Sequence, residues 1–163
     1  MTTLEEYIKP SDEFLLFIDE TLYQHACHAV EEFLLNYEPV NKRQLYSIPA
    51  VIEAQGRSGL EDLIKNQREK NTKEKNKLFW EFLFEIISKS STFSLTNLLV
   101  SELNKKSFLK DEETVTDKVQ KKRIRKDNNA IIDKVIDKVL PVYFEHFNCH
   151  YFYKTSKELY HET

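Results

Sequence analysis

Glycine is almost absent from this chain: only 2 of its 163 residues are glycine, against a usual share of about 7%. Glycine provides the positive φ angles of tight turns and the close backbone approach that phosphate-binding loops need. The sequence contains no GxxxxGK[ST], GxGxxG, GxSxG or HExxH motif, so the usual signatures of NTPases, dinucleotide-binding proteins and α/β-hydrolases are missing. We therefore favour a function other than catalysis, one that requires no cofactor.

Apolar residues recur every three or four positions over most of the chain, a spacing typical of amphipathic helices. The length fits one domain, 1–163, and we expect a mainly α bundle of about five to seven helices. Residues 12–37 form a first strong helix capped by Ser11, and residues 130–140 form a strong core helix before Pro141 forces a kink or a stop. The predicted buried positions are Leu15, Ile18, Leu22, Ala26, Ala29 and Phe33 in the first helix and Ile131, Ile132, Val135, Ile136 and Val139 in the second.

Proline, glycine and capping residues predict where the helices between these two begin and end. Pro49 has no amide hydrogen, so we expect an interruption or a bend near Ile48. Both glycines lie in the segment GRSG at 56–59, where Gly56 would end one helix and Ser58 with Glu61 would form the capping box of the next.

A further helix is predicted to follow Thr72 as its cap, with Trp80 outside the buried stripe. A short helix would then begin near Leu95. The stripe of the first of these helices consists of Leu78, Phe79, Phe82, Leu83, Ile86 and Ile87.

The last third of the chain leaves two questions open. Residues 104–129 contain too few large apolar side chains to bury one face continuously, so we expect a solvated helix or an ordered arm there. In residues 142–153 the density of Val, Tyr and Phe favours a strand, whereas Tyr143, Phe147 and Tyr151 repeat at helical spacing. Both a helix and a small C-terminal β-hairpin about Asn148 are therefore compatible with the sequence.

Charge is distributed very unevenly. Residues 1–36 hold eight acidic residues and one lysine, whereas the whole chain has a net charge of only −3, so an acidic helical N-terminal part (1–55) precedes a net basic remainder. The basic excess is densest in 118–126, which contains no acid and six bases: Lys118, Lys121, Lys122, Arg123, Arg125 and Lys126. On a helix, the first three lysines and Arg125 share one face. A weaker bias in 65–77 includes Lys73 and Lys75, and folding could bring the two segments together.

The dense basic run has two interpretations. Lys and Arg that neutralise backbone phosphates release counterions, which gives salt-dependent affinity without a shaped pocket. We therefore predict a surface that binds nucleic acid or nucleotide phosphates, with Asn128 and Asn129 as neighbours able to reach base edges or to act as ordinary turn residues. The alternative is a solvated basic helix that forms weak surface ion pairs with the acidic N-terminal helix, within the fold or across a dimer.

Arg57 and Ser58 form the one candidate phosphate loop. Together with the flanking glycines they place a guanidinium and a hydroxyl at a predicted helix N-terminus, where free amide groups and the helix dipole favour an anion. The simpler interpretation is a junction of two helices, because a C-cap glycine and a capping box already account for these residue types.

Histidines and aromatic residues give weaker hypotheses. His25 with His28 and His146 with His150 have the spacings that put two imidazoles on one helix face, so two antiparallel helices could assemble a zinc site. Partly buried, hydrogen-bonded histidines are the more common outcome, and we predict no metal. The C-terminal aromatic residues could stack on bases or belong to the core: Tyr151, Phe152, Tyr153 and Tyr160.

The sequence predicts a small, mainly helical, cytoplasmic protein without membrane segments, because neither a signal peptide nor a long apolar run is present. Its first predicted partner is nucleic acid or a nucleotide. The alternative is a protein-binding module, such as an antitoxin-like neutraliser of a basic protein or a subunit of a homo-oligomer. In that case the acidic N-terminal helix would engage the positive partner.

Overall fold

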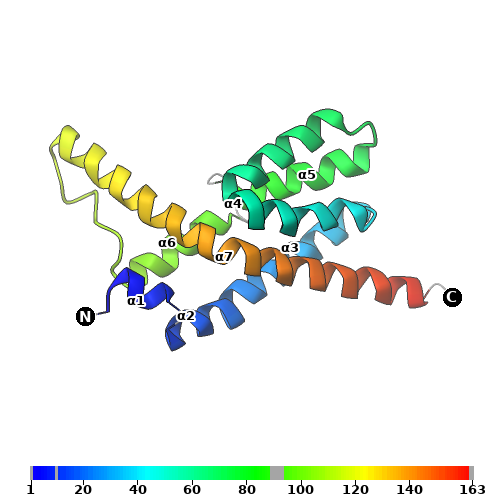
Figure 1. Ribbon diagram of the computed structural model, residues 1–163, viewed down its shortest axis with the longest axis horizontal. Helices are drawn as coiled ribbons and strands as arrows, with labels where there is room; N and C mark the ends of the chain where they lie inside the picture. Colours follow the sequence, from blue (N-terminus) through cyan, green and yellow to red (C-terminus); the bar gives the residue numbers. More distant parts are fainter. Residues whose placement is uncertain (1, 10, 89–93, 162–163) are drawn as a thin grey trace.

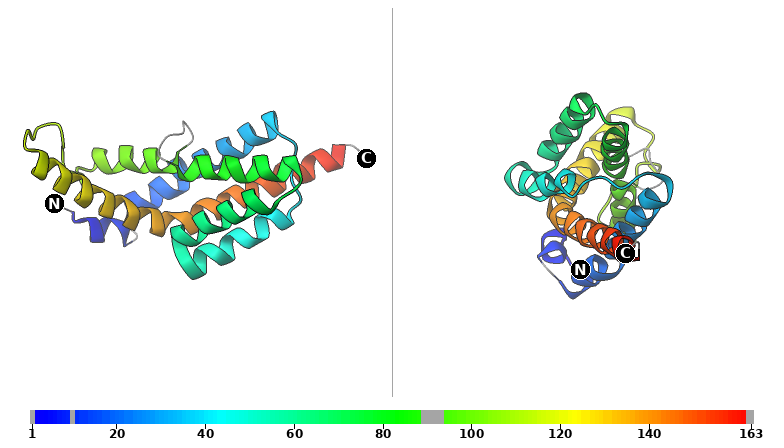
Figure 2. Two further views of the ribbon diagram at one scale, coloured as in Figure 1. Left: turned by 90° about the horizontal axis from the view of Figure 1, so that it is seen from above. Right: turned by 90° about the vertical axis from the view of Figure 1, so that its right-hand side faces the viewer.

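The protein is mainly helical, and Figures 1 and 2 show its arrangement in a computed structural model. The structure describes residues 2–9, 11–88 and 94–161, with side chains up to residue 156. Over these ranges it contains helices and their connections and no strand: α1 (Leu4–Ile8), α2 (Asp12–Leu16), the π-helical turn η1 (Phe17–Leu22), α3 (Tyr23–Asn36), α4 (Arg43–Lys70), α5 (Glu74–Ile87), α6 (Leu95–Lys105) and α7 (Lys118–His161).

The long helix α7 is the axis on which the other helices assemble. It packs against α3, α4 and α6, and Figure 1 shows it running across the whole molecule. The buried residues form one continuous apolar cluster, to which α7 contributes Ile132, Val135, Ile136, Val139, Leu140, Tyr143, Phe144, Phe147 and Tyr151.

Of the two outcomes expected at Pro141, a kink or a stop, the stop does not occur. Of the two conformations left open for 142–153, the helix is confirmed and the hairpin about Asn148 does not form, because α7 continues through both residues. A proline inside a helix costs about 3 kcal/mol. Burial of one large apolar side chain returns about 1.5 to 3 kcal/mol, and Tyr143, Phe144 and Phe147 are all buried just beyond the proline. Helical spacing places these residues against α3 and α4, so packing outweighs both the proline and the strand propensity.

The first long helix forms from Ser11, as predicted, but its buried positions differ at the start. The Ser11 hydroxyl accepts a hydrogen bond from the Phe14 amide at 3.2 Å, and Phe14 and Phe17 are buried instead of the predicted Leu15. A regular α-helix cannot turn both phenylalanines to the side that carries Leu22. The π turn η1 supplies about 4.4 residues per turn and rotates the helix by the missing amount, so Leu22 and the residues after it keep the predicted register.

Helix α4 is interrupted at Gly56 and not near Ile48. Gly56 has φ 64° and ψ −149°, a conformation that is almost restricted to glycine, whereas Pro49 lies within regular helix. Pro49 cannot bond the carbonyl of Leu45, and the buried Asn148 amide of α7 donates to this carbonyl at 3.5 Å. A side chain from another helix therefore replaces part of the missing backbone hydrogen bond.

Helix α5 buries five of the six residues of its predicted stripe, all except the half-buried Leu78, and it also buries Trp80, which the sequence placed outside the stripe. Trp80 is fully buried, and its indole nitrogen donates to Gln44 Oε1 at 2.9 Å. This happens because α4 packs on α5, so α5 faces apolar neighbours on two sides. The predicted cap is also wrong by one residue, since α5 begins after Lys73 without a side-chain cap.

Helix α6 begins near the predicted residue and ends in a Schellman motif without glycine. The Ser94 hydroxyl caps its first turn. At its end the amides of Ser107 and Phe108 bond the carbonyls of Asn104 and Leu103 at 3.1 and 3.0 Å, with Ser107 at φ 62°. The motif turns Phe108 onto the Tyr7 ring, 5.3 Å between ring centroids, so the connection 106–117 leaves α6 in a defined direction.

None of the described helices is long and apolar enough to cross a membrane. The longest, α7, has charged residues throughout its first third and on the exposed side of the remainder.

Candidate polyanion-binding surface

The basic run occupies the first turns of α7, which stand clear of the other helices. Figures 1 and 2 show this part of α7 extending beyond the helical body, accompanied by the connection 106–117. Lys, Arg and Gln are good helix formers, and the segment continues a helix that is already fixed by its buried residues further on. The prediction of a solvated helix is therefore confirmed for 118–129, whereas 106–117 is a folded connection.

The side chains of this run point in two directions. Lys118, Lys122, Arg123 and Lys126 are exposed, and we call these four residues the basic stripe. Lys121 is half-buried and Arg125 pairs with Glu112 of the connection. The face predicted from Lys118, Lys121, Lys122 and Arg125 is thus partly turned toward the connection, and the solvent-exposed face is centred near Lys122 and Lys126.

The basic stripe has no carboxylate at ion-pair distance within the described part of the chain. The acidic N-terminal residues pair with other bases. Glu5 pairs with Lys134 at 2.7 Å, Glu13 with Lys106 at 2.8 Å, and Glu31 with Lys154 at 3.3 Å. The interpretation that the basic run neutralises the acidic helix within the same fold is therefore not supported.

An exposed valine lies in the middle of the basic stripe. Val119 is 71% exposed and shares its helix face with Lys122, Arg123 and Lys126, because these residues follow it by three, four and seven positions. An open groove of about 900 Å³ runs along this face and reaches Asp133 at its far end. The sequence already contained this signal, since the same spacing is visible without the structure.

Asn128 holds the connection 106–117 against α7. Its side-chain oxygen accepts from the Lys110 amide at 2.9 Å, and its side-chain nitrogen donates to the Lys110 carbonyl at 2.9 Å. An ion pair between Lys110 and Asp127 at 3.1 Å lies beside it. The Asn128 side-chain amide therefore uses for the backbone of Lys110 the same donor and acceptor that it would need for an adenine edge. Of the two asparagines, only Asn129 is exposed.

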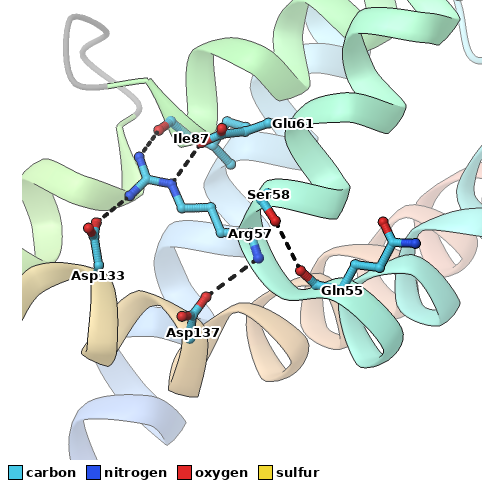
Figure 3. A network of polar contacts seen from close by, with 7 residues as sticks. All are labelled: Gln55, Arg57, Ser58, Glu61, Ile87, Asp133 and Asp137. Atoms are coloured by element: carbon cyan, nitrogen blue, oxygen red, sulfur yellow. Dashed lines mark hydrogen bonds and ion pairs between the residues drawn. The ribbon is translucent and has the colours of Figure 1, made fainter. Parts of the chain in front are cut away.

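The segment around Arg57 is surrounded by carboxylates (Figure 3). Arg57 pairs with Asp133 at 2.9 Å and with Glu61 at 3.0 Å, and it also donates to the Ile87 carbonyl at 3.4 Å. The backbone amide of Arg57, at the start of the second half of α4, points to Asp137 Oδ1 at 3.4 Å. A carboxylate of α7 thus occupies the position where an anion was expected.

The predicted capping box at Ser58 is not formed. The Ser58 hydroxyl donates to the Gln55 carbonyl at 3.3 Å, while Glu61 pairs with Arg57. A groove of about 370 Å³ beside Ser58 is lined by three carboxylates and one guanidinium. Its charge is unfavourable for a phosphate, so Arg57 and Ser58 stay a sequence-based candidate that this geometry does not strengthen.

The second basic segment lies away from the first. Lys73 and Lys75 belong to the turn between α4 and α5 and its first residues, and Figures 1 and 2 place this turn toward the opposite end of the long axis from the basic stripe. A groove of about 700 Å³ beside the segment 65–77 is lined by acids and bases together, and Arg68 lies over the Phe84 ring at 5.1 Å. The two segments therefore do not form one surface.

The four candidate metal ligands lie on two helices that pack together, as the metal hypothesis required. His25 bonds the buried Tyr143 hydroxyl at 2.9 Å, and His150 bonds Glu31 at 3.3 Å. His146 stacks edge-on against Tyr23, whereas His28 is exposed. In the ranges that the structure describes, no three His, Cys, Asp or Glu residues are grouped so as to hold a metal ion.

The same interface contains Cys27, whose thiol is half-buried. Burial raises the pKa of Cys27, and a hydrogen bond with Tyr23 opposes part of that increase. A thiol with a raised pKa is a poor nucleophile at neutral pH, so the surroundings of Cys27 do not activate its thiol.

The C-terminal aromatic residues belong mostly to the fold. The buried Tyr151 hydroxyl accepts from the Val40 amide at 2.7 Å and donates to the Val40 carbonyl at 2.9 Å, which fixes the connection between α3 and α4. Phe152 packs against Tyr46 with 6.0 Å between ring centroids, and Tyr153 is exposed. The side chain of Tyr160 lies outside the described residues. Of the three described side chains in this group only Tyr153 is exposed, so these three do not present a row of exposed rings on which bases could stack.

Comparison of the chain with family models, with curated proteins and with solved structures gives no match in any of the three. The functional argument therefore depends on the surfaces described above.

Proposed function

We propose that this protein is a non-enzymatic nucleic-acid-binding protein that contacts the phosphate backbone through the basic stripe of α7. The observation that carries the proposal is the combination of four exposed cations, their position on a helix that extends beyond the body, and the absence of described carboxylate partners. Like charges on one helix face repel one another. A polyanion removes that repulsion and releases its own counterions, which favours binding.

The dimensions of the stripe agree with a phosphate backbone. From Lys118 to Lys126 the helix rises about 12 Å, which three or four successive phosphates of one strand cover at about 3.4 Å each. Nothing in the stripe offers a specific pattern of base-edge donors and acceptors, since its members are lysines and one arginine. We therefore expect binding that depends weakly on nucleotide sequence and strongly on salt.

The test is fluorescence anisotropy with labelled single-stranded and duplex oligonucleotides and with a labelled nucleotide. We expect micromolar or tighter binding to an oligonucleotide at about 50 mM salt and a slope of log K against log salt of about −3 to −4, as four neutralised phosphates give. The triple variant Lys122→Glu, Arg123→Glu, Lys126→Glu is expected to lose this binding.

A matched control separates the stripe from net charge. The variant Lys65→Glu, Lys70→Glu, Lys73→Glu changes the net charge by the same amount toward the other end of the molecule, and it is expected to bind like the unmodified protein. Absence of binding at low salt, or equal losses in both variants, would overturn the proposal.

A second candidate function, protein binding through the acidic N-terminal helix, is favoured by a different observation. The turns of α2 and η1 expose two leucines between acidic residues, which nucleic-acid binding does not explain.

A further inference from the structure

Two leucines are exposed to solvent beside the π turn η1. By rotating Phe14 and Phe17 into the core, it turns Leu15 and Leu16 outward, where they are 41% and 57% exposed. Tyr23, eight residues after Leu15, is 44% exposed at the edge where its ring packs against His146 of α7. Exposed apolar side chains that lie next to one another and within a charged rim are typical of interaction surfaces, and π turns are frequent at functional sites.

The rim of these apolar residues is acidic. Asp12, Asp19 and Glu20 are exposed and are not at ion-pair distance from any base among the residues that the structure describes. We name Leu15, Leu16, Asp19, Glu20 and Tyr23 the acidic leucine face. A partner that covers it must bring an apolar side chain together with cations, because desolvating unpaired carboxylates against a neutral surface is unfavourable.

The chain itself carries a surface of that description. The basic stripe surrounds the exposed Val119 with Lys122, Arg123 and Lys126, so an apolar centre with a positive rim faces solvent along an open groove. The stripe is short enough to lie within the length of the acidic leucine face, since residues 118–126 rise about 12 Å and residues 12–23 about 17 Å. We propose that the basic stripe of one copy docks on the acidic leucine face of a second copy, with Val119 against Leu15 and Leu16.

The geometry of this contact determines how assembly proceeds. Each copy offers both surfaces, so the contact either repeats head to tail, as a chain or a ring, or is exchanged reciprocally between two copies about a twofold axis. Both surfaces are small, which places the contact among weak, salt-sensitive interfaces. The stripe is also the proposed phosphate-binding surface, so a nucleic acid and the second copy compete for it, but the docking does not depend on nucleic-acid binding.

Sedimentation velocity over a concentration series, without nucleic acid, tests the contact. We expect the weight-average sedimentation coefficient to rise with concentration at about 50 mM salt and to return to the monomer value at about 300 mM, where charges are screened within about 6 Å. One variant removes the face (Leu16→Ser, Glu20→Ser), and another removes the stripe (Val119→Ser, Lys122→Ser, Lys126→Ser). Each variant is expected to remain monomeric. All five positions are exposed, so both variants should fold like the unmodified chain.

An equimolar mixture of the two variants provides the decisive measurement. One intact stripe then meets one intact face, so a heterodimer forms and nothing larger does. The control Glu53→Ser, Glu145→Ser, at exposed acidic positions elsewhere, is expected to associate like the unmodified chain. The proposal is overturned if the unmodified chain stays monomeric at low salt, if either variant still associates, or if the mixture gives no heterodimer.

The two proposals fail separately. The face variant keeps the basic stripe, so its nucleic-acid affinity should be equal to or greater than that of the unmodified protein. Loss of self-association in this variant with intact nucleic-acid binding would establish that the two activities use different surfaces.

Discussion

The two parts of α7 show how differently one continuous helix can be stabilised. In residues 118–129 only Ile124 is buried, whereas residues 130–152 bury nine apolar side chains against α3, α4 and α6. The second part is helical because the burial of these nine side chains stabilises it. The first part forms because propagation from an existing helix costs little for Lys, Arg and Gln, and because Asn128 and Arg125 tie it to the connection 106–117.

This difference assigns stability to one part of the helix and binding to the other. Substitutions in the apolar part should change the free energy of unfolding, and substitutions in the basic stripe should change affinity only. The predictions below test that separation, beginning with the largest expected effect.

Replacement of Phe144 by alanine tests the apolar part. The Phe144 ring is fully buried and lies 5.2 Å from the Tyr143 ring and 5.7 Å from the Phe147 ring, between centroids. Its removal leaves a cavity, and the free energy of unfolding should fall by about 3 to 5 kcal/mol. Lys122→Ala should change it by less than about 0.5 kcal/mol. Urea denaturation followed by circular dichroism measures both, and similar losses would contradict the separation.

Replacement of Gly56 by alanine tests the junction that α7 makes with α4. An alanine would have to adopt φ 64° and ψ −149°, and its Cβ would meet Asp137 Oδ1 of α7 at 3.4 Å. We expect a loss of about 1 to 3 kcal/mol in the free energy of unfolding. Ser58→Ala, two residues on, serves as the control and should be nearly neutral. An unchanged stability in Gly56→Ala would mean that the chain crosses this junction in another conformation.

Replacement of Asn128 by alanine tests what holds the basic part in place. The variant loses the two hydrogen bonds with Lys110, which should lower the free energy of local unfolding by about 1 kcal/mol. Amide hydrogen exchange should accelerate in the connection 106–117 and in the first turns of α7, while residues 130–152 keep their protection. Gln120→Ala, at an exposed position, is the control. Equal acceleration along the whole helix would show that its two parts unfold as one unit.

The smallest expected effect is the pH dependence of the contact between α3 and the end of α7. Hydrogen bonds from His150 and then Lys154 lower the pKa of Glu31 below its usual 4.5. The folded pKa is below the unfolded one, so the contribution is present above the unfolded pKa and is lost as the pH falls through the folded value. Because Glu31 is half exposed, we expect no more than about 1 kcal/mol.

Glu31→Gln separates this contribution from the other carboxylates. The variant should show a weaker decline of the free energy of unfolding between about pH 5 and pH 3, and the same stability profile near neutrality apart from a constant offset. A decline as steep as that of the unmodified protein would show that Glu31 gains nothing from its two partners.

Local signals predicted much of the fold. The cap at Ser11, five of the six residues of the predicted stripe of α5 and the apolar positions 132–139 follow from residue type and spacing, and the structure confirms them. The interruption expected near Pro49, the stop considered at Pro141 and the exclusion of Trp80 from the buried stripe do not occur, for one common reason. In each case an adjacent helix supplied packing or a hydrogen bond that no local rule can include.

The candidate surface was partly visible in the sequence. The six bases of 118–126 and the spacing of Val119 from Lys122 and Lys126 were apparent, but which of the six face solvent depended on where the connection 106–117 docks. The same holds for the acidic helix. Its charge was evident, whereas the exposure of Leu15 and Leu16 accompanies the π turn η1 and the burial of Phe14 and Phe17.

The sequence by itself determined the helical class of this protein and the sign of the charge along each segment, because helical spacing and side-chain charge are local properties. Only the tertiary structure decided that α7 continues through Pro141, that an acidic carboxylate sits at the Arg57 junction, and that the acids of the N-terminal part pair with Lys106, Lys134 and Lys154. These outcomes depend on contacts between residues far apart in the chain. At Pro141 the free energy of packing exceeds a local preference of about 3 kcal/mol, whereas the ion pairs depend on where the fold places the two partners.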